Sequence, residues 1–323
     1  MKEKSIRPKK IFDKYIALSK KDAKIFFYNS SKKIILCPAC KNNGKFFIEK
    51  DNFKYYKCQK CLTIYANPRH NAKAFQRYYS LSSSAKFWAT DFYKRTLNER
   101  VKRMWKPKAK VVQRIIKKEK NIKNIIDIGA GYGLFLNEIK KKSKINTFAL
   151  EPSKILGDIC KENKHTVLNY FLENIPKSKI PKSKNIYTCF ELFEHLHDPK
   201  LFLKKLYNFM KKGEMVILTT LSGVGLDIDV LGKASKSIQP PYHINFFNPE
   251  SIKFLLKKSR FKVIEITTPG KLDIDILANN YHKIENPFWQ KFIKNSSDVE
   301  KNLMQKFIQK NLLSSHMSII FKK

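Results

Sequence analysis

One segment of the chain constrains the fold more than any other. The apolar run Asn124–Ile128 leads into Gly129, Gly131 and Gly133, and an apolar helical pattern begins at Leu134. Glycine adopts positive φ angles freely and lets a ligand approach the backbone closely. A strand that enters such a turn, followed at once by a helix, is typical of α/β sheets that bind a ligand at the turn.

The residues after Pro107 alternate between short apolar runs and helical patterns. This alternation predicts a doubly wound, mainly parallel sheet with helices on both faces. The predicted strands are 124–128, 147–150, 166–168, 186–190, 215–220, 261–267 and 316–321. The predicted helices are 134–141, 154–163, 199–211 and 249–258, with one long helical stretch at 287–312.

Four segments are predicted along the chain. Residues 1–30 form a basic tail and a short helix, with Ser19 and Asp22 spaced as the capping box at its start. Residues 31–70 form a small unit around four cysteines, and residues 71–106 form an aromatic helical connector or lid. Residues 107–323 form the main domain, which carries the glycine-rich turn.

The four grouped cysteines predict a structural metal site. Cys37 and Cys40 are separated by two residues, as are Cys58 and Cys61, and seventeen residues lie between the pairs. Two such pairs place four thiolates around a tetrahedral Zn²⁺ and leave no open position for water. Two disulfides, or four unbound buried cysteines, are the alternatives. The single cysteines, Cys160 and Cys189, are expected to be small core residues.

The glycine turn is expected to bind a nucleoside cofactor. Its spacing is G-x-G-x-G, whereas nicotinamide-binding turns use G-x-G-x-x-G. Asp127 at the strand end would repel a pyrophosphate but would suit the ammonium group of a methionine moiety. Glu151, which ends the second strand, is placed to accept hydrogen bonds from ribose hydroxyls.

Residues 107 to about 270 resemble class I S-adenosylmethionine-dependent methyltransferases. Asp127–Gly133 is similar to the first motif of this family, Phe190–Pro199 to the segment after the fourth strand, and Lys212–Leu218 to the fifth strand. The resemblance implies the sheet order 3-2-1-4-5-7-6 with an antiparallel seventh strand. It implies a site for S-adenosylmethionine built from Asp127, Gly129, Ala130, Gly131, Gly133, Glu151, Glu173 and Phe190, with Glu173 matching only loosely.

Four further segments point to a subgroup. The cysteine pairs, Tyr65–Arg69, the aromatic connector and Gln239–Phe247 are together similar to bacterial methyltransferases, which often belong to sugar or surface-polysaccharide pathways. The resemblance implies a small-molecule acceptor such as a nucleotide sugar, methylated on oxygen or carbon. The related sugar C-methyltransferases carry a long additional C-terminal domain without a counterpart in this sequence, so the acceptor atom stays open.

Three side chains are candidates for chemistry on the acceptor. Transfer to oxygen or carbon needs a proton to be removed, and His243 is the first candidate base. His195 and Glu194, just after the fourth strand, are the next. Alternatively, Glu194 and His195 tie their loop to the following helix and take no part in the reaction.

The formal charge of +39 raises the possibility of a nucleic-acid partner. Only 8 of the 66 basic residues are Arg, the side chain best suited to phosphate and base edges. A compositional excess of Lys is therefore the favoured explanation. An RNA methyltransferase and a non-catalytic zinc-ribbon adaptor are the alternative functions. The lack of a long apolar run predicts a cytoplasmic protein without a membrane span, and the oligomeric state stays open.

Overall fold

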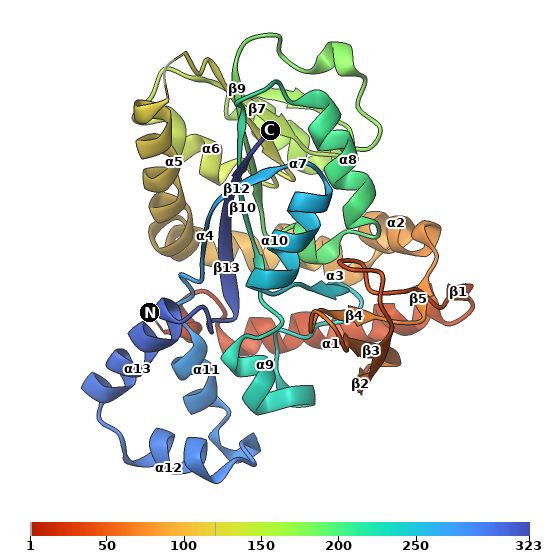
Figure 1. Ribbon diagram of the computed structural model, residues 1–323, viewed down its shortest axis with the longest axis vertical. Helices are drawn as coiled ribbons and strands as arrows, with labels where there is room; N and C mark the ends of the chain where they lie inside the picture. Colours follow the sequence, from red (N-terminus) through yellow and green to blue (C-terminus); the bar gives the residue numbers. More distant parts are fainter. Residues whose placement is uncertain (1, 120) are drawn as a thin grey trace.

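The computed structural model describes residues 2–119 and 121–323, and a seven-stranded sheet forms its centre (Figure 1). The strand order is β12-β13-β10-β9-β6-β7-β8, which is the order implied by the family resemblance. The strands are β6 (Asn124–Ile128), β7 (Asn146–Leu150), β8 (Thr166–Leu168), β9 (Asn185–Phe190), β10 (Met215–Leu221), β12 (Lys262–Thr267) and β13 (His316–Lys322).

The sheet is mixed rather than strictly parallel. β13 lies between β10 and β12 and runs antiparallel to both. The reason lies in the connection that precedes it. The helices between β12 and β13 stay at the end of the sheet where β12 finishes, so the chain enters β13 from that same end (Figure 1).

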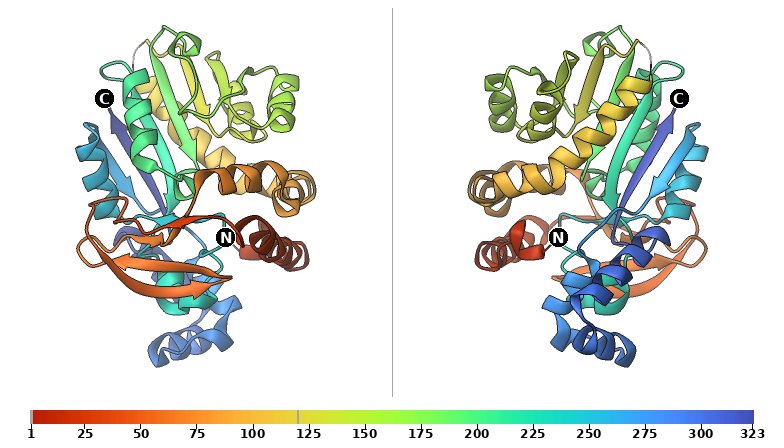
Figure 2. Two further views of the ribbon diagram at one scale, coloured as in Figure 1. Left: turned by 90° about the vertical axis from the view of Figure 1, so that its right-hand side faces the viewer. Right: turned by 90° about the vertical axis from the view of Figure 1, so that its left-hand side faces the viewer.

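Helices cover both faces of the sheet (Figure 2). Alternate strand residues point to opposite faces, so Ile125, Ile186 and Ile217 pack on one side, while Ile126, Tyr187 and Leu218 pack on the other. The first side is covered by α5 (Lys106–Lys118), α6 (Leu134–Lys140) and α7 (Lys154–Glu162). The second is covered by α8 (Pro199–Phe209) and α10 (Pro249–Lys258).

The N-terminal segments gather at the carboxyl end of the parallel strands (Figure 1). The helices there are α1 (Lys9–Phe27), α2 (Ala72–Leu81), α3 (Ser83–Phe87) and α4 (Tyr93–Arg100). Two π-helical turns, Trp88–Phe92 and Val101–Trp105, join α3, α4 and α5 into one rod that passes Pro107 without a break. Such turns inside helices occur frequently at functional sites.

The four-cysteine segment folds onto a second sheet of four strands. Its order is β11-β4-β3-β2, with β2 (Gly44–Lys50), β3 (Phe53–Cys58), β4 (Ile64–Ala66) and β11 (Asn245–Phe246). A two-residue pair, β1 (Lys32–Lys33) with β5 (Arg69–His70), lies beside it. Because β11 comes from the second half of the chain, the small sheet is completed by the main domain.

Two predictions about helices are wrong. Ser19 and Asp22 do not start a helix, because they lie buried inside the 19-residue α1. There, the Ser19 hydroxyl donates to the Pro240 carbonyl oxygen, and Asp22 accepts from the backbone N–H of Ser84. The helical stretch at 287–312 is two helices, α12 (Pro287–Asn295) and α13 (Asp298–Lys310). Ser297 separates them because it forms a capping box with Glu300.

The remaining helices are α9 (Leu226–Leu231) and α11 (Asp273–Asn279), which pack against each other below the sheet in Figure 1. Across residues 2–119 and 121–323, no helix combines the length and apolarity needed to cross a bilayer.

Candidate active site

The glycine turn lies where the strand order of the large sheet reverses. From β6 the chain continues through β7 and β8 on one side, and returns through β9 and β10 on the other. The carboxyl ends of β6 and β9 therefore lie side by side at this point. In open α/β sheets, ligands bind at this position.

The backbone of the turn needs its glycines. Gly129, Gly131 and Gly133 have φ angles of 73°, 56° and 67°. A Cβ atom at Gly129 would lie 3.1 Å from Leu192 Cδ2, and one at Gly133 would lie 3.0 Å from Cys160 Sγ. A Cβ at Gly131 would meet no atom within 4 Å. The turn thus presents an open face at Gly131, where a ligand could lie against the backbone.

Glu151 connects the ends of β6 and β7. Its side chain is buried, and it accepts hydrogen bonds from the backbone N–H of Gly131 (2.8 Å) and Ser153 (2.9 Å). Burial raises the pKa of its carboxyl group, and the two backbone N–H groups oppose this rise. The predicted ribose-binding acid is therefore in direct contact with the glycine turn.

Asp127 lies under the turn and is 3% exposed. The Thr188 hydroxyl on β9 donates to its Oδ1 at 2.7 Å. Burial raises the pKa of Asp127 to about 7, although this hydrogen bond lowers it in part. The group therefore titrates near neutral pH, and a cation placed beside it would favour the carboxylate form.

This raised pKa predicts a pH dependence of stability. Between the unfolded pKa of about 4 and the folded pKa of about 7, the folded chain holds a proton on Asp127 that the unfolded chain has lost. The contribution of Asp127 to the free energy of unfolding should therefore fall as pH rises from 4 to 7. Asp127→Asn should remove this fall, which amounts to up to about 3 kcal/mol, from the pH dependence of the chain. Urea titrations at several pH values measure it.

Asp229→Asn, on the exposed surface of α9, is the control. Its free energy of unfolding should show the same pH dependence as that of the unaltered chain. If Asp127→Asn leaves the pH dependence of the free energy of unfolding unchanged, Asp127 is not protonated in the folded chain in this pH range.

Aromatic rings form the walls beside the turn. Tyr132 in the turn stacks on Tyr93 of α4, with ring centroids 4.8 Å apart and an interplanar angle of 2°. Phe190 at the end of β9 packs edge-on against Phe135, and Ala130 packs with the same apolar cluster. The helical rod of α3 to α5 thus contacts the glycine turn through Tyr93, which places part of the predicted connector against this turn.

Glu173 is less closely connected to the turn. It lies in the turn after β8 and is half-buried, and burial raises the pKa of its carboxyl group. The charged groups that act on it, Asp198 and Lys205, belong to the start of α8 and to the helix itself. Its role toward a cofactor stays a prediction.

The three predicted catalytic side chains lie together. One ligand atom from each of Glu194, His195 and His243 lies within 4.8 Å of the others, although His243 is 48 residues further along the chain. His195 Nε2 lies 3.9 Å from Glu194 Oε1, and the two imidazole centroids are 5.0 Å apart. The backbone N–H of Ile244 donates to the Glu194 carbonyl oxygen, which holds the two segments side by side.

Each of these side chains is fixed by a further contact. Nδ1 of His195 lies 2.8 Å from the Tyr242 carbonyl oxygen, and Nδ1 of His243 lies 2.6 Å from that of Ser237. A carbonyl oxygen can only accept, so each Nδ1 carries the proton and each Nε2 keeps its lone pair. Burial lowers the pKa of both imidazoles, that of His243 to about 3.

Glu194 is almost completely buried. Thr220 on β10 donates to its Oε2 at 2.7 Å, and burial raises the pKa of Glu194 to about 7. The site thus combines two neutral imidazoles with a carboxyl group that ionises near neutral pH.

A neighbouring ionic network was not predicted from the sequence. Glu191 has a φ of 53°, and its Oε1 accepts from Lys108 (2.6 Å), Thr219 (2.8 Å) and His316 (2.7 Å). Burial would raise the pKa of Glu191, but His316 and Lys108 hold it well below its usual range. Lys108, Thr219 and His316 lie 83, 28 and 125 residues away in the sequence, so only the Glu191 position itself, within the Phe190–Pro199 motif, carried a signal.

The four cysteines form a compact cluster as predicted. Cys37 Sγ lies 3.5 Å from Cys61 Sγ, and Cys40 Sγ lies 3.4 Å from Cys58 Sγ. All six cysteines of the chain are free thiols. A hydrogen bond from the Cys37 thiol lowers the pKa of Cys61. Cys160 and Cys189 are buried apolar-cluster residues, as expected.

Comparison with known proteins agrees with this geometry. A family described as a methyltransferase domain matches residues 94–266, which is more than half of the chain. The ubiquinone biosynthesis O-methyltransferase of Coxiella burnetii (strain RSA 331 / Henzerling II) is 25% identical over 180 residues, covering 51% of this chain and 70% of the relative. The malonyl-[acyl-carrier protein] O-methyltransferase 2 of Ilyobacter polytropus is 25% identical over 173 residues, covering 52% and 63%.

Solved structures share the fold. The plantazolicin methyltransferase BamL, in complex with a triazolic desmethylPZN analog and SAH, superimposes with a TM-score of 0.50 at 13% identity, covering 77% of this chain and 94% of BamL. A methyltransferase in complex with the Trm112 activator of Haloferax volcanii has the same TM-score at 12% identity, covering 73% and 95%. With the family match and the glycine turn, they lead to one conclusion: the chain belongs to the methyltransferase-domain family and is an S-adenosylmethionine-dependent methyltransferase.

Proposed function

We propose that this protein methylates an oxygen or carbon atom of a small acceptor, such as a nucleotide sugar or a polysaccharide precursor. One observation carries the proposal. The glycine turn, with its open face at Gly131, follows β6, and Glu194 and His195, which lie beside His243, follow the neighbouring strand β9 at the same end of the sheet. A methyl donor held at the turn would therefore have its acceptor beside the cluster.

The turn residues would divide the cofactor between them. Gly129, Ala130 and Gly131 would lie along the methionine moiety, with Asp127 near its ammonium group, and Gly133 would start the helix behind it. Glu151 would exchange its bond to the Gly131 N–H for bonds to the ribose hydroxyls. Phe190 would contact the adenosine portion, and Glu173 would approach the adenine from the turn after β8.

The cluster contains side chains that could accept the proton of the acceptor. Sulfonium methyl transfer is a displacement, so the enzyme's main task is to hold the acceptor at attacking distance with water excluded. Without any bound cation, His243 Nε2 is the first candidate to receive the acceptor proton, and His195 Nε2 is the second. Glu194 would stabilise the imidazolium that forms.

The lid favours a small acceptor over a nucleic-acid duplex. Tyr79 of α2 lies 6.4 Å from His195 by ring centroids, and its hydroxyl donates to the Tyr242 carbonyl oxygen. Together with the Tyr93–Tyr132 stack, this contact places α2 against the Glu194–His195–His243 cluster and α4 against the glycine turn. The relatives named above are O-methyltransferases of ubiquinone biosynthesis and of malonyl-acyl-carrier protein, which also supports a small-molecule acceptor.

We propose further that the four cysteines hold a structural zinc ion. Zn–S bonds of 2.3 Å in a tetrahedron place sulfur atoms about 3.8 Å apart, close to the two Sγ–Sγ distances found here. Four thiolates occupy every position of a tetrahedral ion. The ion would therefore stabilise the segment 31–70 and its junction with β11, beside a lid at 71–106 and a catalytic domain at 107–323.

The test separates a small acceptor from RNA. The purified chain is incubated at physiological salt with methyl-labelled S-adenosylmethionine and either a set of nucleotide sugars or total RNA. We expect label on a small acceptor, and only weak RNA binding that falls steeply with added salt, because spread Lys charges bind phosphate without preference. Label at a defined RNA site that persists at high salt would show that the acceptor proposal is wrong.

A further inference from the structure

We propose that Glu194, His195 and His243 form a second metal site, which binds one divalent transition-metal cation at the acceptor position. The four-cysteine cluster is a separate site with different chemistry. The binding itself stands on the geometry below. Its role in activating the acceptor rests on the proposed function.

The three side chains offer a suitable ligand set. Two imidazole nitrogens and one carboxylate oxygen suit Zn²⁺, Mn²⁺ or Fe²⁺, and they leave coordination positions open. Ligands of one ion at bond lengths of about 2.1 Å lie about 3 to 3.5 Å apart. The separation of His195 Nε2 from Glu194 Oε1 is 3.9 Å, and all three ligand atoms fall within 4.8 Å. Small side-chain adjustments would bring them onto one ion.

Both imidazoles are already oriented as metal ligands usually are. A metal-binding His donates its other N–H to a carboxylate or a backbone carbonyl, which fixes its tautomer and its ring. His195 makes this bond to the Tyr242 carbonyl oxygen, and His243 makes it to that of Ser237. A single catalytic base would need only one histidine with such a hydrogen bond to a carbonyl oxygen. Here it occurs in two adjacent rings, with centroids 5.0 Å apart.

The Glu194 carboxylate is also held by a hydrogen bond that leaves one oxygen free. Thr220 donates to Glu194 Oε2, which leaves Oε1, the oxygen nearer to His195, available for a cation. Glu191 is not available as a ligand, because its Oε1 already accepts from Lys108, Thr219 and His316. This neighbouring carboxylate adds negative charge near the site without entering it.

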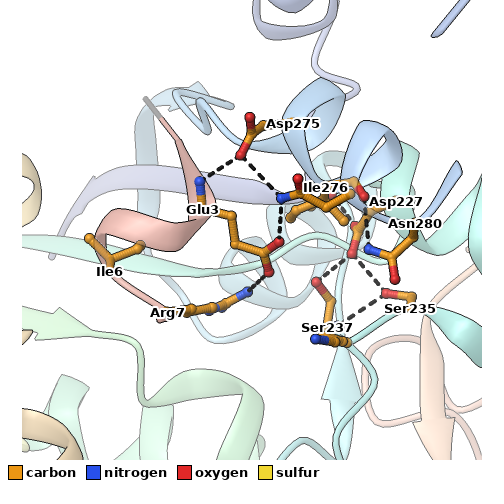
Figure 3. Close-up of polar contacts among 12 residues, drawn as sticks. Glu3, Ile6, Arg7, Asp227, Ser235, Ser237, Asp275, Ile276 and Asn280 are labelled. Atoms are coloured by element: carbon orange, nitrogen blue, oxygen red, sulfur yellow. Dashed lines mark hydrogen bonds and ion pairs between the residues drawn. The ribbon is translucent and has the colours of Figure 1, made fainter. Parts of the chain in front are cut away.

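A further layer of hydrogen bonds lies behind Ser237. Figure 3 shows Ser235 and Ser237 bonded to Asp227. Ser237, whose carbonyl oxygen holds His243, donates its hydroxyl to Asp227 Oδ2 at 2.6 Å. Ser235 donates to the same oxygen at 2.7 Å, and Ser315 donates to Oδ1. Asp227 is completely buried. This buried carboxylate therefore fixes the segment that positions His243.

The cation would change how the acceptor is activated. An acceptor hydroxyl bound to it would lose its proton to water more readily, as metal-bound water does. The resulting oxygen would form the new C–O bond while the C–S bond breaks, and the sulfur would keep that electron pair as S-adenosylhomocysteine. Both imidazoles would then serve as ligands, and neither would need to accept the proton.

In the experiment, the zinc-loaded full chain is titrated with Mn²⁺. Binding is measured as the decrease of the electron paramagnetic resonance signal of free Mn²⁺. Mn²⁺ prefers oxygen and nitrogen ligands and so avoids the cysteines. We expect one site per chain, weakened more than about 100-fold in His243→Asn and Glu194→Gln, and about 10- to 100-fold in Asp227→Asn, which acts only through the supporting shell. His282→Ala, on an exposed histidine, should bind like the unaltered chain.

Calorimetry with S-adenosylhomocysteine separates the two proposals. Variants that keep cofactor affinity and lose Mn²⁺ binding support the metal site. Unchanged Mn²⁺ binding in His243→Asn and Glu194→Gln, with normal melting temperatures, overturns it. If the unaltered chain binds Mn²⁺ but not S-adenosylhomocysteine, the metal site stands and the proposed transfer reaction is wrong.

Discussion

Replacing Gly131 with Val should abolish cofactor binding, with the affinity for S-adenosylhomocysteine falling at least about 100-fold in calorimetric titration. The new side chain would project from the open face of the turn, where a Cβ meets no protein atom within 4 Å. That space is the one we assign to the methionine moiety. The N–H of Gly131 would also lose its alignment with Glu151, because a β-branched residue strongly resists a φ of 56°.

Gly213→Val is the matched control. Gly213 has a φ of 81°, a Cβ there would also meet nothing within 4 Å, and it lies in the turn between α8 and β10. Both variants therefore carry similar backbone strain, on the order of 1–2 kcal/mol. The control should lose stability and keep its cofactor affinity. Equal loss of affinity in both variants, or normal affinity in a folded Gly131→Val, would contradict the assignment of the turn.

Replacing both Cys58 and Cys61 with Ser should release about one zinc ion per chain and lower the melting temperature by on the order of 10 °C. Cys37 and Cys58 are fully buried and belong to the same apolar cluster as Ile126, Leu218 and Phe247 of the main domain. Loss of the ion should therefore weaken the whole chain in one transition rather than unfold the N-terminal segment alone. Metal analysis and calorimetric melting measure the two effects.

Cys189→Ser provides the comparison for this variant, because it places the same hydroxyl at another fully buried thiol, one that is not among the four grouped cysteines. It should lose some stability and keep its zinc. Absence of zinc from carefully purified unaltered protein, or intact melting after the double substitution, would disprove the structural role of the ion.

Local patterns in the sequence predicted the parts of the molecule that neighbouring residues determine. The turn at Gly129–Gly133, the alternating strands and the paired cysteines each depend on spacings of a few residues. The position of the seventh strand came from the family resemblance, because no local pattern says that β13 inserts between β10 and β12. His243 and the adjacent pair Glu194 and His195 are separate predictions from the sequence, and only the fold shows that they meet.

Long-range contacts account for what the sequence did not predict. Lys108 and His316 meet at Glu191 only because α5 packs on the sheet and β13 pairs with β10, the strand next to β9. The helix α1 extends over Ser19 and Asp22 because Pro240 and Ser84 satisfy these polar side chains in its interior. The pairing of β4 with β11 connects the four-cysteine segment to a strand that begins two residues after His243. Each of these contacts joins residues whose separation in the sequence carries no periodic signal.

The position of β13 inside the sheet has a consequence for protein synthesis. The ribosome makes β10 and β12 before β13, yet these strands have no pairing with each other and are joined only through it. Until residues 316–322 emerge, β10 and β12 each present an unpaired backbone edge, and such edges promote association between chains. The sheet can therefore close only after translation of its last strand, and folding during synthesis should halt at a five-stranded intermediate of β8-β7-β6-β9-β10.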